Sequence, residues 1–353
     1  MLKIINILLI FIILYIIINT INTNTKPNIP IIKNFKSLSS YTRSSLTNKI
    51  ALLIPIYERD YHYLNGIFTD ILNNLDKVKF DIIFILTYKK DVQMFNEEIK
   101  KYTGINPNEL IFLKIIVLEN YISLDQIQKL LNNQIIIIYK KLFSMYLLTI
   151  ENKKTNNYKY IWNIDSEIRF NNFDNFEETS EQFCKKKILY AGHNIGNDFI
   201  INNSINFFNK EEQKKLEKIK SLYYWYSEIP INDMEILPSF LSYINITDFD
   251  YFIKSFNWFT FDYIVYINYC YLYYDYKIIK INCSNSMESI YLNNFKKIEQ
   301  QIDIHWTNTI NYNIVKNNKK YHLIYHLDRY MISGYTLYGI KSIFDTIYIY
   351  LLN

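Results

Sequence analysis

Four short apolar runs, separated by segments with helical spacing, constrain the fold of this chain most strongly. The runs span residues 49–57, 80–87, 111–118 and 160–164, and apolar residues recur three or four positions apart in the segments between them. Continuous apolar strands that alternate with helices indicate a mostly parallel sheet covered on both faces. The sequence therefore predicts an α/β fold in which right-handed crossovers bring the carboxyl ends of the strands to one edge.

The second half of the chain carries weaker signals of the same kind. We expect helices at residues 61–75, 92–102, 123–131, 136–151, 211–220 and from about 258 onward, and a short strand at residues 187–190. Gly104 is expected to close the second of these helices. The apolar tail, residues 342–352, is expected to pack as a helix or strand.

Two carboxylates follow the fourth apolar run after one intervening residue. Asp165 and Glu167 come directly after the expected strand, where ligands bind in open α/β sheets. Hard divalent cations prefer oxygen ligands and often bridge a carboxylate to substrate phosphates. A D-S-E tripeptide after a strand is also typical of a turn or helix cap, so both interpretations stand at this level.

Several function classes are excluded by missing motifs. No G-x-G-x-x-G or Walker A sequence follows the first strand, which argues against a dehydrogenase and a P-loop NTPase. No G-x-S-x-G is present, so a hydrolase is the least favoured class. The net charge of +5 is spread along the chain, which argues against nucleic-acid binding. The three cysteines lack zinc-ligand and C-x-x-C spacing but leave one disulfide possible.

The N-terminus predicts a membrane anchor. Residues 4–18 are almost wholly apolar, and no small-x-small cleavage site follows, so an uncleaved signal anchor over residues 1–20 is favoured over a cleaved signal. Residues 21–48 are rich in Asn, Thr, Ser and Lys and indicate a flexible stem. Three sequons, at Asn202, Asn245 and Asn282, agree with a lumenal location.

The sequence resembles the nucleotide-sugar-dependent glycosyltransferases of the GT-A fold. The turn Pro-Ile-Tyr-Glu-Arg at residues 55–59 is similar to the one that cups the nucleobase in that group. The helix around residues 140–148, followed by residues 158–161, and the Asp-Ser-Glu at residues 165–167, which is similar to the Asp-x-Asp metal motif, carry the rest. The resemblance covers residues 49–170, and it departs from the group's pattern in the second carboxylate.

The resemblance implies a nucleotide site and a metal site. The nucleotide would be held by a set at the strand ends: Pro55, Tyr57, Arg59, Thr87 and Asp165. A divalent metal, Mn²⁺ or Mg²⁺, would be held by Asp165 and Glu167 and would neutralise the diphosphate of the donor. A C-terminal histidine would be its third ligand, with His305 the first choice and His322 and His326 the alternatives.

The resemblance also implies a general base on the acceptor side. Asp262, in the first turns of the helix that follows Trp258, is the first candidate, and Glu228 is the second. An acidic residue there also favours the start of a helix, which is the structural alternative. His193 is expected to be a structural histidine.

Together these features predict a hexosyltransferase that moves a sugar from a nucleotide sugar to a glycan, glycoprotein or glycolipid. Its catalytic domain would span residues 49–353, with a nucleotide-binding half at 49–170 and an acceptor half at 171–353. The anchor would make it a single-pass type II protein of the Golgi or ER with a lumenal catalytic domain. The alternative is an inactive lumenal binding protein on the same fold.

Overall fold

The computed structural model describes residues 49–166, 168–170, 172–193, 198–219, 222–223, 231–280, 304–307 and 323–326. All of these belong to the second of two compact units, Arg43–Asn353. Among them, no helix is long and apolar enough to cross a membrane. The predicted anchor and stem, Glu167, Glu228 and the apolar tail lie outside the described residues.

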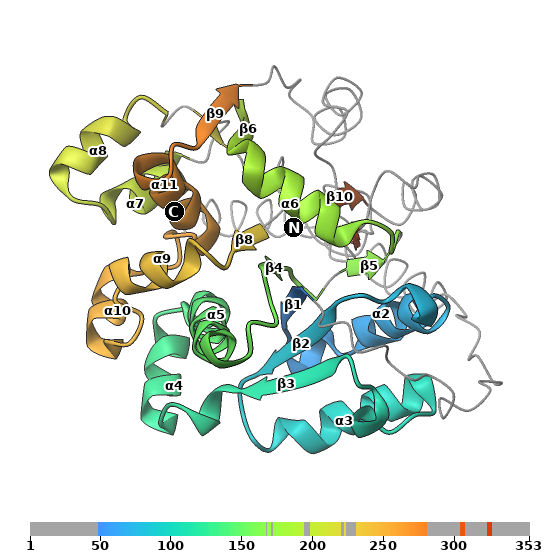
Figure 1. The fold of residues 1–353 in the computed structure, drawn as a ribbon. Helices are drawn as coiled ribbons and strands as arrows, with labels where there is room; N and C mark the ends of the chain where they lie inside the picture. Colours follow the sequence, from blue (N-terminus) through green and yellow to red (C-terminus); the bar gives the residue numbers. More distant parts are fainter. Residues whose placement is uncertain are drawn as a thin grey trace, which may run out of the picture. The chain divides into compact units, whose positions relative to one another are not determined.

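A five-stranded sheet forms the centre of the described unit (Figure 1). Its order is β3-β2-β1-β4-β8, with the bounds Leu113–Val117, Asp81–Leu86, Ile50–Pro55, Tyr160–Asn163 and Ile231–Asp233. The first four strands are parallel, and β8 pairs antiparallel to β4. The predicted α/β fold with a mostly parallel mixed sheet is confirmed, and all four apolar runs are strands.

Helices bury both faces of this sheet because its strands are apolar on both sides. Every residue of β1 and β2 is buried. On one face, Leu53 and Ile83 belong to the core that includes α5, Ile136–Thr155. On the other face, Phe84 packs against Phe68 of α2, His62–Leu72, and Phe95 of α3, Asp91–Thr103. Figure 1 shows α5 on one side of the sheet and α2 and α3 on the other.

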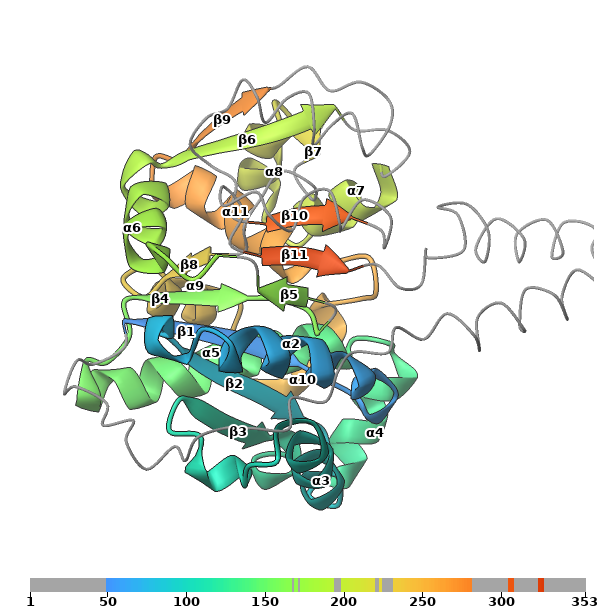
Figure 2. The ribbon, with the colours of Figure 1, turned by 90° about the vertical axis from the view of Figure 1, so that its right-hand side faces the viewer.

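The remaining elements lie over both faces of the central sheet and form two small sheets (Figure 2). The helices are α4 (Leu124–Asn132), α6 (Phe176–Lys186), α7 (Asp198–Asn206), α8 (Lys210–Leu216), α9 (Leu237–Tyr243), α10 (Phe249–Ser255) and α11 (Asp262–Tyr273). Short 3-10 turns are η2 (Glu58–Asp60), η3 (Leu75–Lys77), η4 (Pro107–Glu109) and η5 (Leu118–Asn120). One sheet joins β10 (Ile304–Thr307), β11 (Leu323–His326) and β5 (Ile168–Phe170), and the other joins β7 (Leu222–Tyr223), β6 (Ile188–His193) and β9 (Lys277–Lys280).

Helix ends differ from the sequence expectations where asparagines compete for the backbone. The helix expected to reach residue 75 ends at Leu72, because the Asn74 side chain donates to the Asp70 carbonyl and the chain turns into η3. The helix expected to end at residue 151 continues to Thr155, where Asn156 adopts a left-handed conformation with φ of 49°. Gly104 closes α3 in the same conformation, as predicted.

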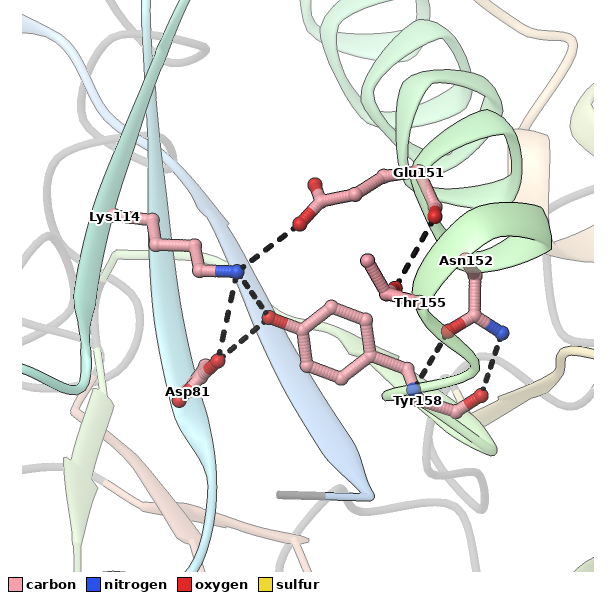
Figure 3. A network of polar contacts seen from close by, with 6 residues as sticks. All are labelled: Asp81, Lys114, Glu151, Asn152, Thr155 and Tyr158. Atoms are coloured by element: carbon pink, nitrogen blue, oxygen red, sulfur yellow. Dashed lines mark hydrogen bonds and ion pairs between the residues drawn. The ribbon is translucent and has the colours of Figure 1, made fainter. Parts of the chain in front are cut away.

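A polar network fixes the C-terminal end of α5 to the edge where the strands begin (Figure 3). The Tyr158 hydroxyl donates to Asp81 Oδ2 over 2.6 Å, and Lys114 Nζ donates to the same hydroxyl over 2.8 Å. Asn152, on the last turns of α5, bonds both the N–H and the carbonyl of Tyr158. Lys114 also pairs with Glu151 at 3.3 Å. The start of α5 is thereby directed toward the opposite, carboxyl edge.

The order of the strands creates a topological switch point between β1 and β4. From β1 the chain moves outward to β2 and β3, and then returns to place β4 on the other side of β1. The crossovers therefore diverge between these two strands, which leaves a crevice outside their carboxyl ends. Pro55 and Asn163 are the last residues of β1 and β4, so the segments that follow them meet at this crevice.

Candidate functional site

The turn after β1 brings an aromatic ring and a guanidinium together. Tyr57 is partly buried and precedes η2, and Arg59 within η2 is exposed, with its Cζ 5.4 Å from the centre of the Tyr57 ring. Burial raises the pKa of the Tyr57 hydroxyl, Arg59 opposes this, and Asp60 and Asp165 add to it. β1 and β4 are paired parallel strands, with Leu53 opposite Asn163, so the segments that carry Tyr57 and Asp165 leave the sheet side by side.

Pro55 and Thr87 mark neighbouring strand ends of the same edge. Pro55 ends β1 and pairs with Ile85 of β2. Thr87 follows β2 directly, is buried, and accepts a backbone hydrogen bond from Glu119 over 3.2 Å. These two residues therefore lie at the carboxyl edge of the sheet. The hydrogen bond from Glu119 joins Thr87 to η5, the turn that follows β3.

Asp165 forms an ion pair with a lysine of α5. Its Oδ1 lies 2.9 Å from Lys141 Nζ, and the side chains are 37% and 16% exposed, respectively. Burial would lower the pKa of Lys141, but Asp165 and Asp262 outweigh it and raise that pKa above its usual value. Asp165 thus stands half-open to solvent at the end of β4 with its charge already partly balanced.

Asp262, at the first position of α11, is the second carboxylate that influences Lys141. It is 5% exposed, and its Oδ2 accepts a hydrogen bond from Asn163 Nδ2 over 3.1 Å. Burial raises the pKa of Asp262 and Asp165 adds to this, whereas Lys141 and the first N–H groups of the helix oppose it. The predicted base therefore belongs to the same cluster as Asp165, and it also starts a helix.

Sequence reasoning assigned no role to Lys140, which the structure places under the Tyr57 turn. Its Nζ donates to the Ile56 carbonyl over 3.1 Å and lies 4.0 Å from the centre of the Tyr57 ring. The side chain is fully buried, and burial lowers its pKa to about 7, which Asp91 and Asp60 partly oppose. The sequence signal that could have indicated it is a pair of adjacent lysines within the mostly apolar run at residues 135–148.

Several predicted site residues are not placed as side chains. Glu167, Glu228 and His322 lie outside the described residues, and for His193, His305 and His326 only the strand backbone is described.

The strand register nevertheless relates two histidine positions to the carboxylate motif. Tyr325 of β11 pairs with Ile168, the first residue of β5, and His326 follows Tyr325 on the same strand. His305 of β10 pairs with Ile324, which pairs in turn with Arg169. Both histidines thus belong to the sheet that begins where the D-x-E motif ends.

The donor chemistry around Asp165 fits a hard divalent cation. Asp165 and Asp262 offer carboxylate oxygens, and Asn163 Oδ1 is buried without a hydrogen-bond partner. Within the part of the chain that the structure describes, no three His, Cys, Asp or Glu side chains gather as a metal-binding group. The fit is therefore to a cation such as Mg²⁺ or Mn²⁺ that takes one or two carboxylates and completes its shell with substrate phosphates.

A cavity of about 650 Å³ opens at the opposite edge of the sheet and is separate from this cluster. It is lined by residues of η3 and near the start of β1 and of α6, including Lys77, Ile50 and Glu177. Ligands of parallel α/β sheets bind at carboxyl ends, so the cluster at the switch point is the candidate site.

The structure resembles solved glycosyltransferases. Core-mannan synthase A from Aspergillus fumigatus, in its Mn/GDP form, is 15% identical over 68% of this chain and 74% of that chain, with a TM-score of 0.35. The mannosyltransferase Ktr4p from S. cerevisiae in complex with GDP is 12% identical over 60% and 65%, with a TM-score of 0.32. This chain therefore spans just under two thirds of the yeast structure.

A glycosyltransferase involved in the glycosylation of the major capsid of PBCV-1 is 10% identical over 78% of this chain and 91% of that chain, with a TM-score of 0.30. No protein-family model and no curated protein matches the chain. A likeness at this level assigns no activity, substrate or metal to this chain, so the proposals below rest on the contacts of the candidate site.

Proposed function

We propose that this protein is a glycosyltransferase that moves a sugar from a nucleotide sugar to a carbohydrate-bearing acceptor. The observation that supports this most directly is the convergence of two different chemistries at the switch point between β1 and β4. Tyr57 and Arg59 offer a ring and a guanidinium to a nucleotide, and Asp165 and Lys141 offer paired charges to a diphosphate.

The nucleotide half of the donor is assigned to the turn after β1. The Tyr57 ring stacks on the base, because an aromatic face suits a flat heterocycle. Arg59 is 81% exposed, lies near the same ring and forms an ion pair with Asp60 at 3.4 Å, and we assign its remaining N–H groups to a ribose or phosphate oxygen. Pro55 and Thr87 shape the floor at the ends of β1 and β2.

The diphosphate is assigned to the end of β4. Asp165 would hold a divalent cation there, with Glu167 and His305 as its further predicted ligands. When bound, such a cation offsets the charge that develops on the leaving diphosphate. Lys141 contributes a fixed positive charge at the same point, 2.9 Å from Asp165 Oδ1.

The acceptor is assigned to the side of α11. Asp262 is the proposed base that takes the proton from the acceptor hydroxyl, with Glu228 as the second candidate. Burial raises the pKa of Asp262, which makes its carboxylate a stronger base than an ordinary aspartate. Its Asn163 hydrogen bond orients the carboxylate.

A non-catalytic binding protein on the same fold is the second candidate. The observation that favours it is the ion pair of Asp165 with Lys141, which already neutralises the carboxylate that the cation requires. Nucleotide binding without sugar transfer or donor hydrolysis would distinguish this candidate from an enzyme.

We also propose that the protein is a hexosyltransferase held by residues 1–20 as a single-pass type II protein of the Golgi or ER. The proposal rests on the apolar run at residues 4–18 and the sequons. Glycosylation at Asn202, Asn245 or Asn282, measured as a mass shift removed by an endoglycosidase, would support it. A full-length protein extracted from membranes by carbonate would contradict it.

The function is tested by calorimetric titration of UDP and GDP into the full chain, with and without Mn²⁺. We expect Mn²⁺-dependent binding of one nucleotide in the wild type and at least tenfold weaker binding in Asp165→Asn. Asp76→Asn is the matched control, because this exposed carboxylate lines the cavity at the opposite edge of the sheet. Failure of both nucleotides to bind would overturn the proposed function.

A further inference from the structure

Lys140 is a buried cation that contacts the nucleotide turn from the interior of the protein. Its Nζ donates to the Ile56 carbonyl over 3.1 Å and lies 4.0 Å from the centre of the Tyr57 ring. No part of the side chain is exposed. These two contacts join α5 to the segment that leaves β1, and they fix both the direction of the chain and the plane of the ring.

The charge of Lys140 lacks a close carboxylate. Within the described residues, no Asp or Glu oxygen forms an ion pair with it, and its nearest acidic influences are Asp91 at the start of α3 and Asp60 in η2. The other charged group at the Tyr57 ring is Arg59, whose side chain is 81% exposed. The Ile56 carbonyl and the Tyr57 ring therefore provide the close favourable contacts of the buried ammonium.

A lysine in this position is expensive for stability. Moving an ammonium out of water without a paired anion is strongly unfavourable, and an apolar side chain of similar length would fill the same space at lower cost. Charged groups retained in such environments are concentrated at functional sites. The neighbouring Lys141 on the same helix differs from Lys140, because its charge is paired with Asp165.

We infer that Lys140 is a positioning residue for the nucleotide. It holds the Ile56 carbonyl and the Tyr57 ring in place, so that the base of a nucleoside diphosphate stacks on a ring that is already oriented and has a positive charge beneath it. The inference rests on the proposed function. It adds a residue that does not touch the nucleotide, and it makes nucleotide affinity depend on a positive charge beneath the ring.

The dependence has a defined direction with pH. Burial lowers the pKa of Lys140 to about 7, so the ammonium form dominates at pH 6 and the neutral amine at pH 8. The neutral amine retains a hydrogen bond to Ile56 but loses the attraction to the ring. Nucleotide affinity should therefore fall as the pH rises from 6 to 8.

The test compares Lys140→Met and Lys140→Arg with the wild type by titration of UDP and GDP at pH 6.0 and 8.0, with Mg²⁺ present throughout. In the wild type we expect affinity to fall about three- to tenfold between the two values, in line with the strength of a desolvated cation–π contact. Lys140→Met should bind weakly at both values, and Lys140→Arg should bind equally at both. Thermal unfolding confirms that each variant is folded.

Failure of the inference and failure of the proposed function give different results in this test. A folded Lys140→Met that keeps wild-type affinity and the wild-type change with pH overturns the inference and leaves the proposed function intact. A wild type that binds neither nucleotide at either pH overturns the proposed function and the inference with it. The nucleotide's own titration is the same for all variants, so only the difference between variants is attributed to Lys140.

Discussion

Lys141 Nζ and Asp165 Oδ1 lie 2.9 Å apart at the carboxyl end of β4, and the buried Asp262 raises the pKa of the same lysine from α11. One ammonium thus serves two carboxylates that would otherwise repel each other. A divalent cation at Asp165 has to share this carboxylate with Lys141. The strength of the pair therefore sets how readily the site accepts a metal before a nucleotide arrives.

Removing that ammonium should have opposite effects on metal affinity and stability. In Lys141→Met we expect Mn²⁺ to bind more tightly in the absence of nucleotide, measured by the loss of the free Mn²⁺ resonance. We also expect the free energy of unfolding to fall by about 1–3 kcal/mol, because Asp262 is left buried beside Asp165. Unchanged Mn²⁺ affinity would contradict the competition between Lys141 and metal.

Asp262→Asn separates nucleotide binding from proton transfer. We expect nucleotide affinity within about twofold of the wild type, and loss of sugar transfer by at least about a hundredfold, as removal of a general base predicts. In the wild type, transfer should rise with pH through the raised pKa of Asp262. A variant with full transfer activity would leave Asp262 as only the start of α11.

Asp262 should also make the free energy of unfolding depend on pH. Its pKa is raised in the folded state, so its protonated form is favoured there, and stability declines as the pH rises from the unfolded value through the folded one. Asp262→Asn lacks this decline. Chemical unfolding of both proteins at pH 4 and pH 7 checks it, with a smaller difference between the two values expected for the variant.

Lys140→Met should be more stable than the wild type at pH 6. The folded pKa of Lys140 is about 7 against 10.5 for an unperturbed lysine, so the unfolded state binds the proton more readily and stability rises from pH 7 to pH 10. The gain corresponds to at most about 5 kcal/mol, at about 1.4 kcal/mol for each unit of pH. The expected result is that the free energy of unfolding rises more between pH 7 and pH 10 in the wild type than in the variant.

Gly66→Ala tests the support of the segment that carries the D-x-E motif. A Cβ at Gly66 would lie 2.7 Å from Arg169 Cδ, and Arg169 is held by two short hydrogen bonds to Asp70 on the same helix. We expect a loss of about 1–3 kcal/mol in the free energy of unfolding, as for overpacking. Gly104→Ala, where space is open but φ is 71°, is the control for backbone strain alone.

Mn²⁺ titration of His305→Ala and His326→Ala, with nucleotide bound, tests which of the two histidines binds the metal. His305 is the first choice for the third ligand and His326 is an alternative, and both lie on strands of the sheet that includes β5. Replacement of the histidine that binds the metal should lower Mn²⁺ affinity at least tenfold, and replacement of the other should leave it unchanged. Equal, unchanged affinities in both variants would remove the C-terminal histidine from the site.

The sequence by itself determined the strands and the residues that follow them. Runs such as Ile50–Pro55 and residues 160–164 are short and almost wholly apolar, which is typical of strands buried on both faces. Tyr57 and Asp165 come directly after such runs, so their location at the carboxyl edge followed from local pattern alone. The cap at Gly104 is equally local, whereas α11 begins at Asp262 and not near residue 258 as the sequence predicted.

Only the tertiary structure decided which strand ends meet and which lysines are buried. The order β3-β2-β1-β4-β8 depends on how helices pack over both faces, and no local pattern records it. Lys140 and Lys141 are adjacent in sequence, yet one lies under Tyr57 and the other pairs with Asp165. Successive residues of a helix point about 100° apart, so their partners are set by the elements packed against each side of α5.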